Sequence, residues 1–226
     1  IPCSARLPVI VLISSAIFGS RAPFMIFSLY IISIITAILS GVLFSKTALR
    51  DKSEGMIMEL PDYRWPQVKN LFVRAWSQSK EYLLKAGTVI FGISVILFLL
   101  SYFPRGTEGG FIHIAGHYIS PLFRPLGFDI PMTVSLITGF FAKESIISTL
   151  SVLYQTSALP LSDYLSAHWN ALSGFVFMVF VMIYIPCIAT VAVIRKETGS
   201  NKWTLISVLY SLAAAYTISL IFKLIL

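Results

Sequence analysis

Two cysteines stand at equivalent positions of a repeated decapeptide. Residues 1–10, IPCSARLPVI, and residues 185–194, IPCIATVAVI, agree at six of ten positions and contain Cys3 and Cys187, the only cysteines in the chain. Such a match indicates an internal repeat, and thiols are ligands for soft metal ions. We therefore interpret both cysteines as functional. The alternative is that each is a small apolar residue that permits close helix packing.

A proline precedes each of these cysteines. Pro2 and Pro186 each remove a backbone donor and disturb a helix, which frees carbonyl oxygens beside the thiol. Interrupted helices in corresponding halves of a membrane protein are typical of the central site of a transporter. We predict that both prolines break helices at a gate.

An acidic residue, Glu144, lies near the middle of the apolar run 131–154. A charged side chain at membrane depth costs about 2.5–3.5 kcal/mol on insertion scales, so its presence indicates a partner or an ion. On a helix, Glu144, Ser148 and Ser151 form one polar stripe that could line a hydrated path, with Lys143 about 100° away. The alternative is a Lys–Glu network that bridges neighbouring helices.

Thiols, a carboxylate and freed carbonyl oxygens point to iron, zinc or copper(I) rather than to magnesium, calcium or sodium. The carboxylate favours iron(II) over copper(I). Lesser candidates for the same ion are two hydroxyl groups and a pair of histidines at four-residue spacing in an amphipathic outer segment: Ser4, Ser148, His113 and His117. Paired histidines at this spacing are also common on ordinary surfaces.

Motifs of enzymatic chemistry are absent from the sequence. It has no phosphate-binding loop, no dinucleotide-binding glycine pattern, no His-Glu-x-x-His and no Ser/His/Asp set that we can place. We predict no enzymatic activity and no resident cofactor for this segment. The net charge of +7 comes from basic residues near the ends of apolar runs, which is typical of lipid contact rather than nucleic-acid binding.

The elements that position these residues are membrane helices. Of 226 residues, 57% are hydrophobic and 12% charged, whereas a soluble domain holds about 25% charged residues. The mean hydropathy is +0.84. A spanning helix needs about 20 apolar residues. Four stretches meet this test and two are irregular candidates: 24–44, 87–103, 172–194 and 203–226, then 7–20 and 131–154. The sequence predicts an all-α, polytopic transmembrane helical bundle with interrupted or re-entrant helices.

Charge predicts the orientation of these helices. The polar segment 45–85 holds eight of the 17 basic residues, which indicates a cytoplasmic loop, and 68–86 has the pattern of an amphipathic helix on the inner membrane surface or of a solvated linker helix. Residues 155–171 hold no Lys or Arg, whereas 195–202 are basic. The intervening region 104–154 must therefore cross an even number of times. We favour a broken or re-entrant element at 131–154 over a second crossing at 111–126, which makes the cysteine repeat an inverted one.

Several motifs resemble the bacterial ferrous iron transport protein B (FeoB) family, in order along the chain. The N-terminal IPCSARLPV resembles the first gate motif and MELPDYRWP the cytoplasmic signature. The others are AGTVI at 86–90, PLGF at 125–128, GFFAKE at 139–144, YIPCIAT at 184–190 and RKETG at 195–199. In the second gate, Ile188 stands opposite Ser4, so the hydroxyl beside Cys3 has no counterpart beside Cys187.

The resemblance implies the C-terminal membrane half of a ferrous iron permease in the bacterial inner membrane. It implies Fe²⁺ as the transported ion, Cys3 and Cys187 as gate cysteines, and Glu144 as the acidic residue of the Ala-Lys-Glu motif. GTP and Mg²⁺ would belong to an N-terminal GTPase domain of the same parent chain. A small cytoplasmic accessory protein and a homo-oligomer are further expected partners. The alternatives are a gate-domain transporter of another divalent metal or a nucleoside, or a non-transporting assembly subunit.

The chain begins at Ile1 inside a motif, so we expect a fragment of a longer protein. We divide it into four parts. Residues 1–44 hold the end of the first gate region and a transmembrane helix, and 45–86 the cytoplasmic loop. Residues 87–130 hold a transmembrane helix and an outer loop, and 131–226 the second gate region with the C-terminal transmembrane helices.

Overall fold

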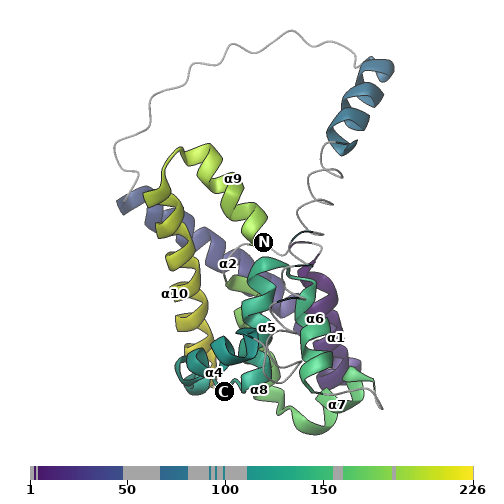
Figure 1. The fold of residues 1–226 in the computed structure, drawn as a ribbon, viewed down its shortest axis with the longest axis vertical. Coiled ribbons are helices and arrows are strands. Elements are labelled where there is room, and N and C mark those ends of the chain that lie inside the picture. The colour runs from purple at the N-terminus through teal and green to yellow at the C-terminus, as the bar shows by residue number, and fades with distance from the viewer. Residues whose placement is uncertain are drawn as a thin grey trace.

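The computed structural model describes residues 3, 5–47, 67–80, 92, 95, 99, 111–154, 160–184 and 187–225 (Figure 1). Within these residues the chain is helical and contains no strand, which confirms the predicted all-α class. The elements are α1 (Arg6–Phe18), η1 (Gly19–Arg21), α2 (Ala22–Thr47), α4 (Phe111–Phe123), η2 (Arg124–Leu126), α5 (Ile130–Phe141), α6 (Ser145–Leu153), α7 (Leu161–His168), α8 (Ala171–Ile183), α9 (Ile188–Thr198) and α10 (Asn201–Ile225).

Helix α8 is the centre of the bundle. Every side chain from Val176 to Met182 is buried, and α8 packs against α1, α2 and α10. A helix that is apolar all round is stable only when neighbours cover all of its faces. Phe177 and Phe180 are fully buried and form edge-to-face pairs with Phe128, which ties α8 to the start of α5.

Two helices in the part of the chain that the structure describes are long and apolar enough to cross a bilayer. Helix α2 has 26 residues and α10 has 25. At a rise of 1.5 Å per residue each is about 38 Å long, which exceeds the hydrocarbon thickness of about 30 Å. The apolar run that contains α2 starts at Arg6, but the chain reverses at Gly19, whose φ is +51°, so α1 and α2 form a hairpin. These helices cover the predicted spans 24–44 and 203–225, and their crossing of a membrane stays a prediction. The predicted span 87–103 lies outside the described residues except at three positions.

Residues 130–154 form a helical hairpin, as a re-entrant element requires. Helix α5 runs up to a turn at Ala142–Glu144, and α6 runs back beside it (Figure 1). The Oγ1 atoms of Thr138 and Thr149 lie 3.0 Å apart between the two helices. At the open end, the Tyr154 hydroxyl donates to Asp129 Oδ2 at 2.6 Å. Both ends of the segment therefore lie on one side of the bundle, as the charge pattern predicts.

The predicted span 172–194 is interrupted in the described structure. Helix α8 ends at Ile183 and α9 begins at Ile188, on either side of the second proline motif. Helix α1 runs down from the region of the N-terminus, whereas α9 runs up from the same region (Figure 1). The helices that follow the two cysteines thus diverge in opposite directions from a common level, as an inverted repeat requires.

The C-terminal ends of α2 and α9, which both lie at the upper end of the bundle in Figure 1, carry basic residues. Lys46 lies in the last turn of α2, and Arg195 and Lys196 lie in the last turn of α9. Residues 68–80 form a helix with every side chain exposed. They agree with the helical part of the predicted 68–86 segment, but residues 81–86 lie outside the described chain. The interfacial placement of this helix stays a prediction.

Candidate functional site

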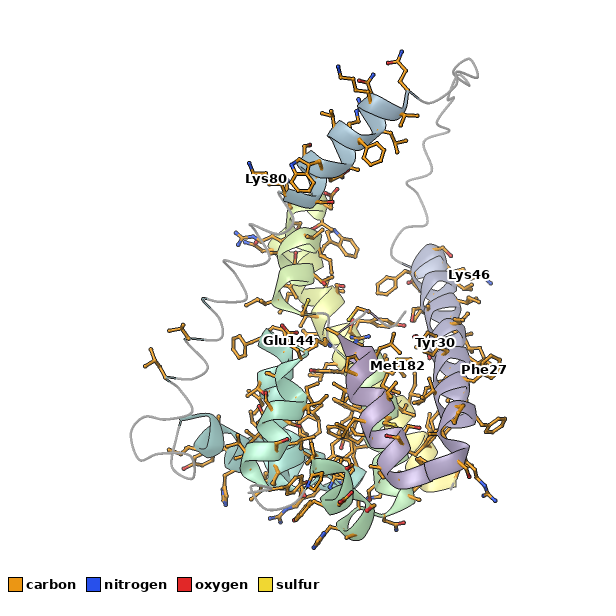
Figure 2. All side chains as sticks on the ribbon, turned by 90° about the vertical axis from the view of Figure 1, so that its right-hand side faces the viewer. Phe27, Tyr30, Lys46, Lys80, Glu144 and Met182 are labelled. Carbon is orange, nitrogen blue, oxygen red and sulfur yellow. The ribbon has the colours of Figure 1, made fainter. Side chains whose placement is uncertain are left out.

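The helix breaks meet at one place inside the bundle. The start of α1, the tip of the α5–α6 hairpin and the end of α8 contribute Arg6, Lys143 and Tyr184, and all three side chains are buried. Figure 2 shows Glu144 at the tip of the hairpin and Met182 beside the start of α1. The cysteines flank this meeting point in sequence, since Cys3 precedes Arg6 and Cys187 follows Tyr184.

Arg6 binds the broken end of α8. Its Nη1 donates to the carbonyl oxygen of Met182 at 2.5 Å and its Nη2 to that of Tyr184 at 2.8 Å. The last carbonyl groups of a helix have no partner within the helix. A guanidinium offers a planar fork of donors, so Arg6 satisfies two such carbonyls at once. The guanidinium is thereby kept inside the bundle, where only 8% of the residue is exposed.

Lys143, at the tip of the hairpin, contacts the ring of Tyr184. Its Nζ sits 3.8 Å from the centroid of the Tyr184 ring, which is the geometry of a cation–π contact. The same ring stacks on Phe180, and its hydroxyl donates to the carbonyl oxygen of Leu136 at 3.4 Å. Tyr184 therefore joins α8 to both the body and the tip of the α5–α6 hairpin.

A glycine makes this contact between hairpin and α8 possible. A Cβ atom at Gly139 would lie 2.5 Å from Ile146 Cγ1 and 2.6 Å from the Tyr184 hydroxyl. Real Cβ atoms do not approach other atoms this closely. Any larger residue at position 139 would therefore have to displace Ile146 or Tyr184. The GFFAKE motif thus begins with the residue that lets α5, α6 and α8 close on one another.

Cys3 and Cys187 lie near these basic residues, and neither forms a disulfide in the part of the chain that the structure describes. Cys3 is exposed and Cys187 is partly buried. The Sγ atom of Cys187 lies 3.3 Å from Thr190 Oγ1. Both cysteines lie within electrostatic range of Arg6 and of Lys143, so the structure brings the two thiols near the same pair of buried basic residues. Pro2, Ser4 and Pro186 lie outside the described residues.

Glu144 stands apart from the buried cations. It occupies the position before α6 and is exposed, as is Ser148, while Ser151 is partly buried. The predicted polar stripe therefore exists on the outward face of α6, and Lys143 points into the bundle. Among the described residues, no three side chains of His, Cys, Asp or Glu gather closely enough to hold a metal ion, so Glu144 and the cysteines do not form one cluster in this conformation.

The histidine pair lies far from the cysteines. Helix α4, which carries His113 and His117, lies at the lower end of the bundle in Figure 1. His117 is exposed and its ring contacts Tyr118; the side chain of His113 is outside the described set. The structure does not bring these residues to the helix breaks.

Sequence reasoning left Arg6 and Tyr184 out of the candidate site and considered Lys143 only as a partner of Glu144 in a helix-bridging network. Arg6 belongs to the first decapeptide, where Thr190 occupies its place in the second copy. This difference within an otherwise matching repeat was the available signal for a special role. Lys143 is charged and adjacent to Glu144 in an apolar run, and the same insertion cost that drew attention to the carboxylate applies to the ammonium group.

Comparison with known families places these features in context. The family described as "Ferrous iron transport protein B C terminus" matches residues 26–78, and the Gate family, described as "Nucleoside recognition", matches residues 83–201. The chain belongs to the ferrous iron transport protein B family. The α5–α6 hairpin and Cys187 lie within the range that the Gate family matches, and Cys3 lies before both matched ranges.

Relatives of the FeoB family cover nearly all of this chain. The Fe(2+) transporter FeoB of Staphylococcus aureus strain MSSA476 is 40% identical over 97% of this chain and 34% of its own length. The Fe(2+) transporter FeoB of Methanocaldococcus jannaschii is 34% identical over 99% of this chain and 35% of its own length. A fusion of Fe(2+) transport protein A with FeoB from Porphyromonas gingivalis is 33% identical over 96% of this chain and 32% of its own length. The chain thus spans about a third of these curated relatives, and no solved structure matches it.

Proposed function

We propose that this chain is the C-terminal permease segment of a transporter that takes up Fe²⁺ across the bacterial inner membrane. The observation that carries the proposal is the meeting of both gate-motif helix breaks, with their cysteines, beside the tip of the α5–α6 hairpin. The Fe²⁺-transporting relatives share this segment over nearly its whole length. Iron(II) is the cargo, and this segment performs no chemical reaction on it.

Cys3, Cys187 and Glu144 are the proposed pathway ligands. Thiolates bind Fe²⁺ more strongly than alkali or alkaline-earth ions, which gives the pathway selectivity. Arg6 opposes tight binding, since a buried positive charge repels a divalent cation at short range. An ion held by few ligands beside a buried cation is bound weakly and leaves readily, which is what conduction requires. Glu144 is exposed on the hairpin tip, where it can meet the ion before or after the thiols.

The basic ends of α2 and α9 are proposed to face the cytoplasm, in line with the positive-inside rule. On this orientation the protein is multi-pass, and the 68–80 helix lies on the side from which a GTPase domain of the parent chain would act. Cross-linking the 45–86 loop to that domain should then trap or uncouple transport; GTP-dependent uptake that continued unaffected would rule this coupling out. The fusion relative supports a small cytoplasmic accessory protein as a further partner.

Two other functions remain alternatives. The description of the Gate family favours a nucleoside as a second cargo class. A non-transporting assembly subunit would use Cys and Glu only for packing. Competition of Mn²⁺, Zn²⁺ and nucleosides with Fe²⁺ in one uptake assay separates the cargo classes.

The decisive experiment measures radiolabelled Fe²⁺ uptake by the full-length protein in membrane vesicles. Cys3→Ser, Cys187→Ser and Glu144→Gln are each expected to lower uptake by about tenfold or more, since each removes a ligand worth at least about 1.4 kcal/mol. Glu197→Gln is the matched control, because Glu197 is an exposed acid on α9 away from the hairpin. Normal uptake in the triple variant, with normal membrane insertion, would favour the assembly function.

A further inference from the structure

The two copies of the repeat are connected through one side chain. Arg6 follows Cys3 in the first copy, and its backbone N–H donates to the Cys3 carbonyl oxygen at 3.0 Å. Its guanidinium then reaches Met182 and Tyr184, on the segment that leads into the second copy. Cys187 comes three residues after Tyr184, which is at most about 11 Å of extended chain. A short path of hydrogen bonds and backbone thus joins one cysteine to the other.

The two copies use this repeat position differently. In the second copy Thr190 replaces the arginine, and its hydroxyl contacts the Cys187 thiol of its own copy. In the first copy the Arg6 side chain instead binds the carbonyl oxygens of Met182 and Tyr184, next to the second copy. The two copies therefore differ in function at this position: Thr190 contacts the cysteine of its own copy, whereas Arg6 connects the first copy to the segment before the second.

Breaking the Arg6 connection is costly. Separating α1 from α8 would leave two carbonyl oxygens without donors and a guanidinium with 8% exposure without acceptors. Buried polar groups that lose their hydrogen bonds destabilise the state that contains them, and charged groups do so most. The hydrogen bonds of Arg6 to the α8 carbonyl oxygens are therefore expected to be either formed or fully broken, without stable intermediate arrangements.

A second basic residue contacts the same segment at a different group. Lys143 at the hairpin tip contacts the ring of Tyr184, while Arg6 binds the backbone carbonyl of the same residue. Residue 184 is therefore fixed by α1 and by the hairpin simultaneously. A movement of residue 184 relative to α1 or to the hairpin must release one of these contacts.

We propose that Arg6 is a positioning residue that clamps the two cysteine-bearing repeat copies together and so sets the separation of Cys3 and Cys187, with Lys143 on Tyr184 as a second fastening. The inference deepens the proposed function, because it rests on the two thiols forming part of one pathway. In this description the clamped state is the narrow state of the gate, and release of Arg6 from the α8 carbonyls widens it.

The test measures the separation of the thiols directly, in the full-length protein in membranes, with cysteines outside this segment replaced. A short and a long bifunctional thiol reagent are applied in parallel without iron, and the Cys3–Cys187 product is quantified by mass spectrometry. Arg6→Gln should slow the short reagent by about tenfold or more, the effect of losing one charged hydrogen bond. Arg6→Lys should give an intermediate rate, because an ammonium group cannot span both carbonyls as a fork does. The long reagent should react as in the wild type.

Controls and contrary outcomes are defined by the structure. Arg21→Gln removes an exposed arginine from η1 and should change neither rate. If Arg6→Gln does not fold, Lys143→Met, which keeps the aliphatic stem, should still slow the short reagent by severalfold. The proposal is overturned if the folded Arg6→Gln protein reacts with the short reagent at the wild-type rate, or if both reagents fail equally. Slower short-range cross-linking together with normal iron uptake in the cysteine variants would instead uphold the clamp and reject the transport role of the thiols.

Discussion

The guanidinium of Arg6 donates to the carbonyl oxygen of Tyr184 at 2.8 Å across 178 residues of sequence. This bond ties the helix that follows one gate cysteine to the break that precedes the other. Because Tyr184 also carries Lys143 on its ring, three elements that are distant in the chain share one anchoring residue. The predictions below test the contacts that hold the α5–α6 hairpin, the thiols and the long helices around this residue.

Gly139→Ala should destabilise the bundle by about 1–3 kcal/mol, the usual cost of overpacking. The new methyl group would overlap Ile146 and the Tyr184 hydroxyl. Thermal unfolding of the purified protein in detergent measures the effect. The control is Gly41→Ala on exposed α2, where a Cβ meets nothing within 4 Å and a gain of about 0.5–1 kcal/mol is expected from helix propensity. Equal unfolding temperatures for the two variants would contradict the close approach at Gly139.

Loss of the Asp129 carboxylate should destabilise the protein more than loss of either of its two hydrogen bonds alone. One carboxylate oxygen accepts from the Met132 N–H at 2.8 Å as the cap of α5, and the other accepts from the Tyr154 hydroxyl. Asp129→Ala should cost about 2–3 kcal/mol, because it removes a helix cap and a charged hydrogen bond. Tyr154→Phe should lose only the second contact. A double-mutant cycle on thermal stability should give a coupling energy of about 1 kcal/mol, and additivity would show that the hairpin ends are not joined.

Thr190→Val should alter the reactivity of one thiol only. The Thr190 hydroxyl lies within hydrogen-bonding distance of Cys187, whereas the equivalent residue Arg6 directs its side chain to α8. Removing the hydroxyl should slow maleimide labelling of Cys187 about two- to fivefold, since hydrogen bonds to sulfur favour the reactive thiolate. Cys3 is the internal control. Thr198→Val, which removes a hydroxyl bound to the Ile194 carbonyl on the same helix, should leave both rates unchanged.

The contact between the two long helices should be weak. The Tyr210 hydroxyl donates to Ser40 Oγ at 2.8 Å, and the Tyr210 ring packs edge-on against Phe44. Tyr210→Phe should cost about 0.6 kcal/mol, the average for a hydrogen bond between membrane helices, and Tyr210→Ala should cost several times more because the ring contact is lost. A loss above about 2 kcal/mol in the phenylalanine variant would mean that this polar contact, rather than packing, holds α2 and α10 together.

The hairpin could be predicted from the sequence because charge limits the number of crossings in 104–154. The basic segments 45–85 and 195–202 and the segment 155–171, which holds no Lys or Arg, agree only if this number is even, and Lys143 and Glu144 in the middle of the apolar run favour a broken element over a second crossing. The contact of Arg6 could not be predicted in this way. This contact depends on the position of the C-terminus of α8 relative to α1. Helical periodicity does not continue across the break between α8 and α9, so the sequence pattern cannot place residues on one side of the break relative to those on the other.

The neighbouring pair at the hairpin tip shows a second limit. Periodicity places Lys143 and Glu144 about 100° apart but does not say which faces the bundle. The structure buries the lysine, because the ring of Tyr184 offers it a partner that the carboxylate cannot use. Glu144 is exposed in the described structure, so its predicted role as a pathway ligand requires that the ion pass along this exposed side of the hairpin tip.

The length of chain between Arg6 and its partners also concerns biosynthesis. A ribosome adding about 5–20 residues per second needs roughly 10–35 seconds to pass from one to the other. During that interval the arginine of α1 must stay at the membrane without the carbonyl oxygens that accept its hydrogen bonds in the finished protein. Final insertion of the first gate helix is therefore expected to wait for the second, which makes α1 the segment most dependent on help from the insertion machinery.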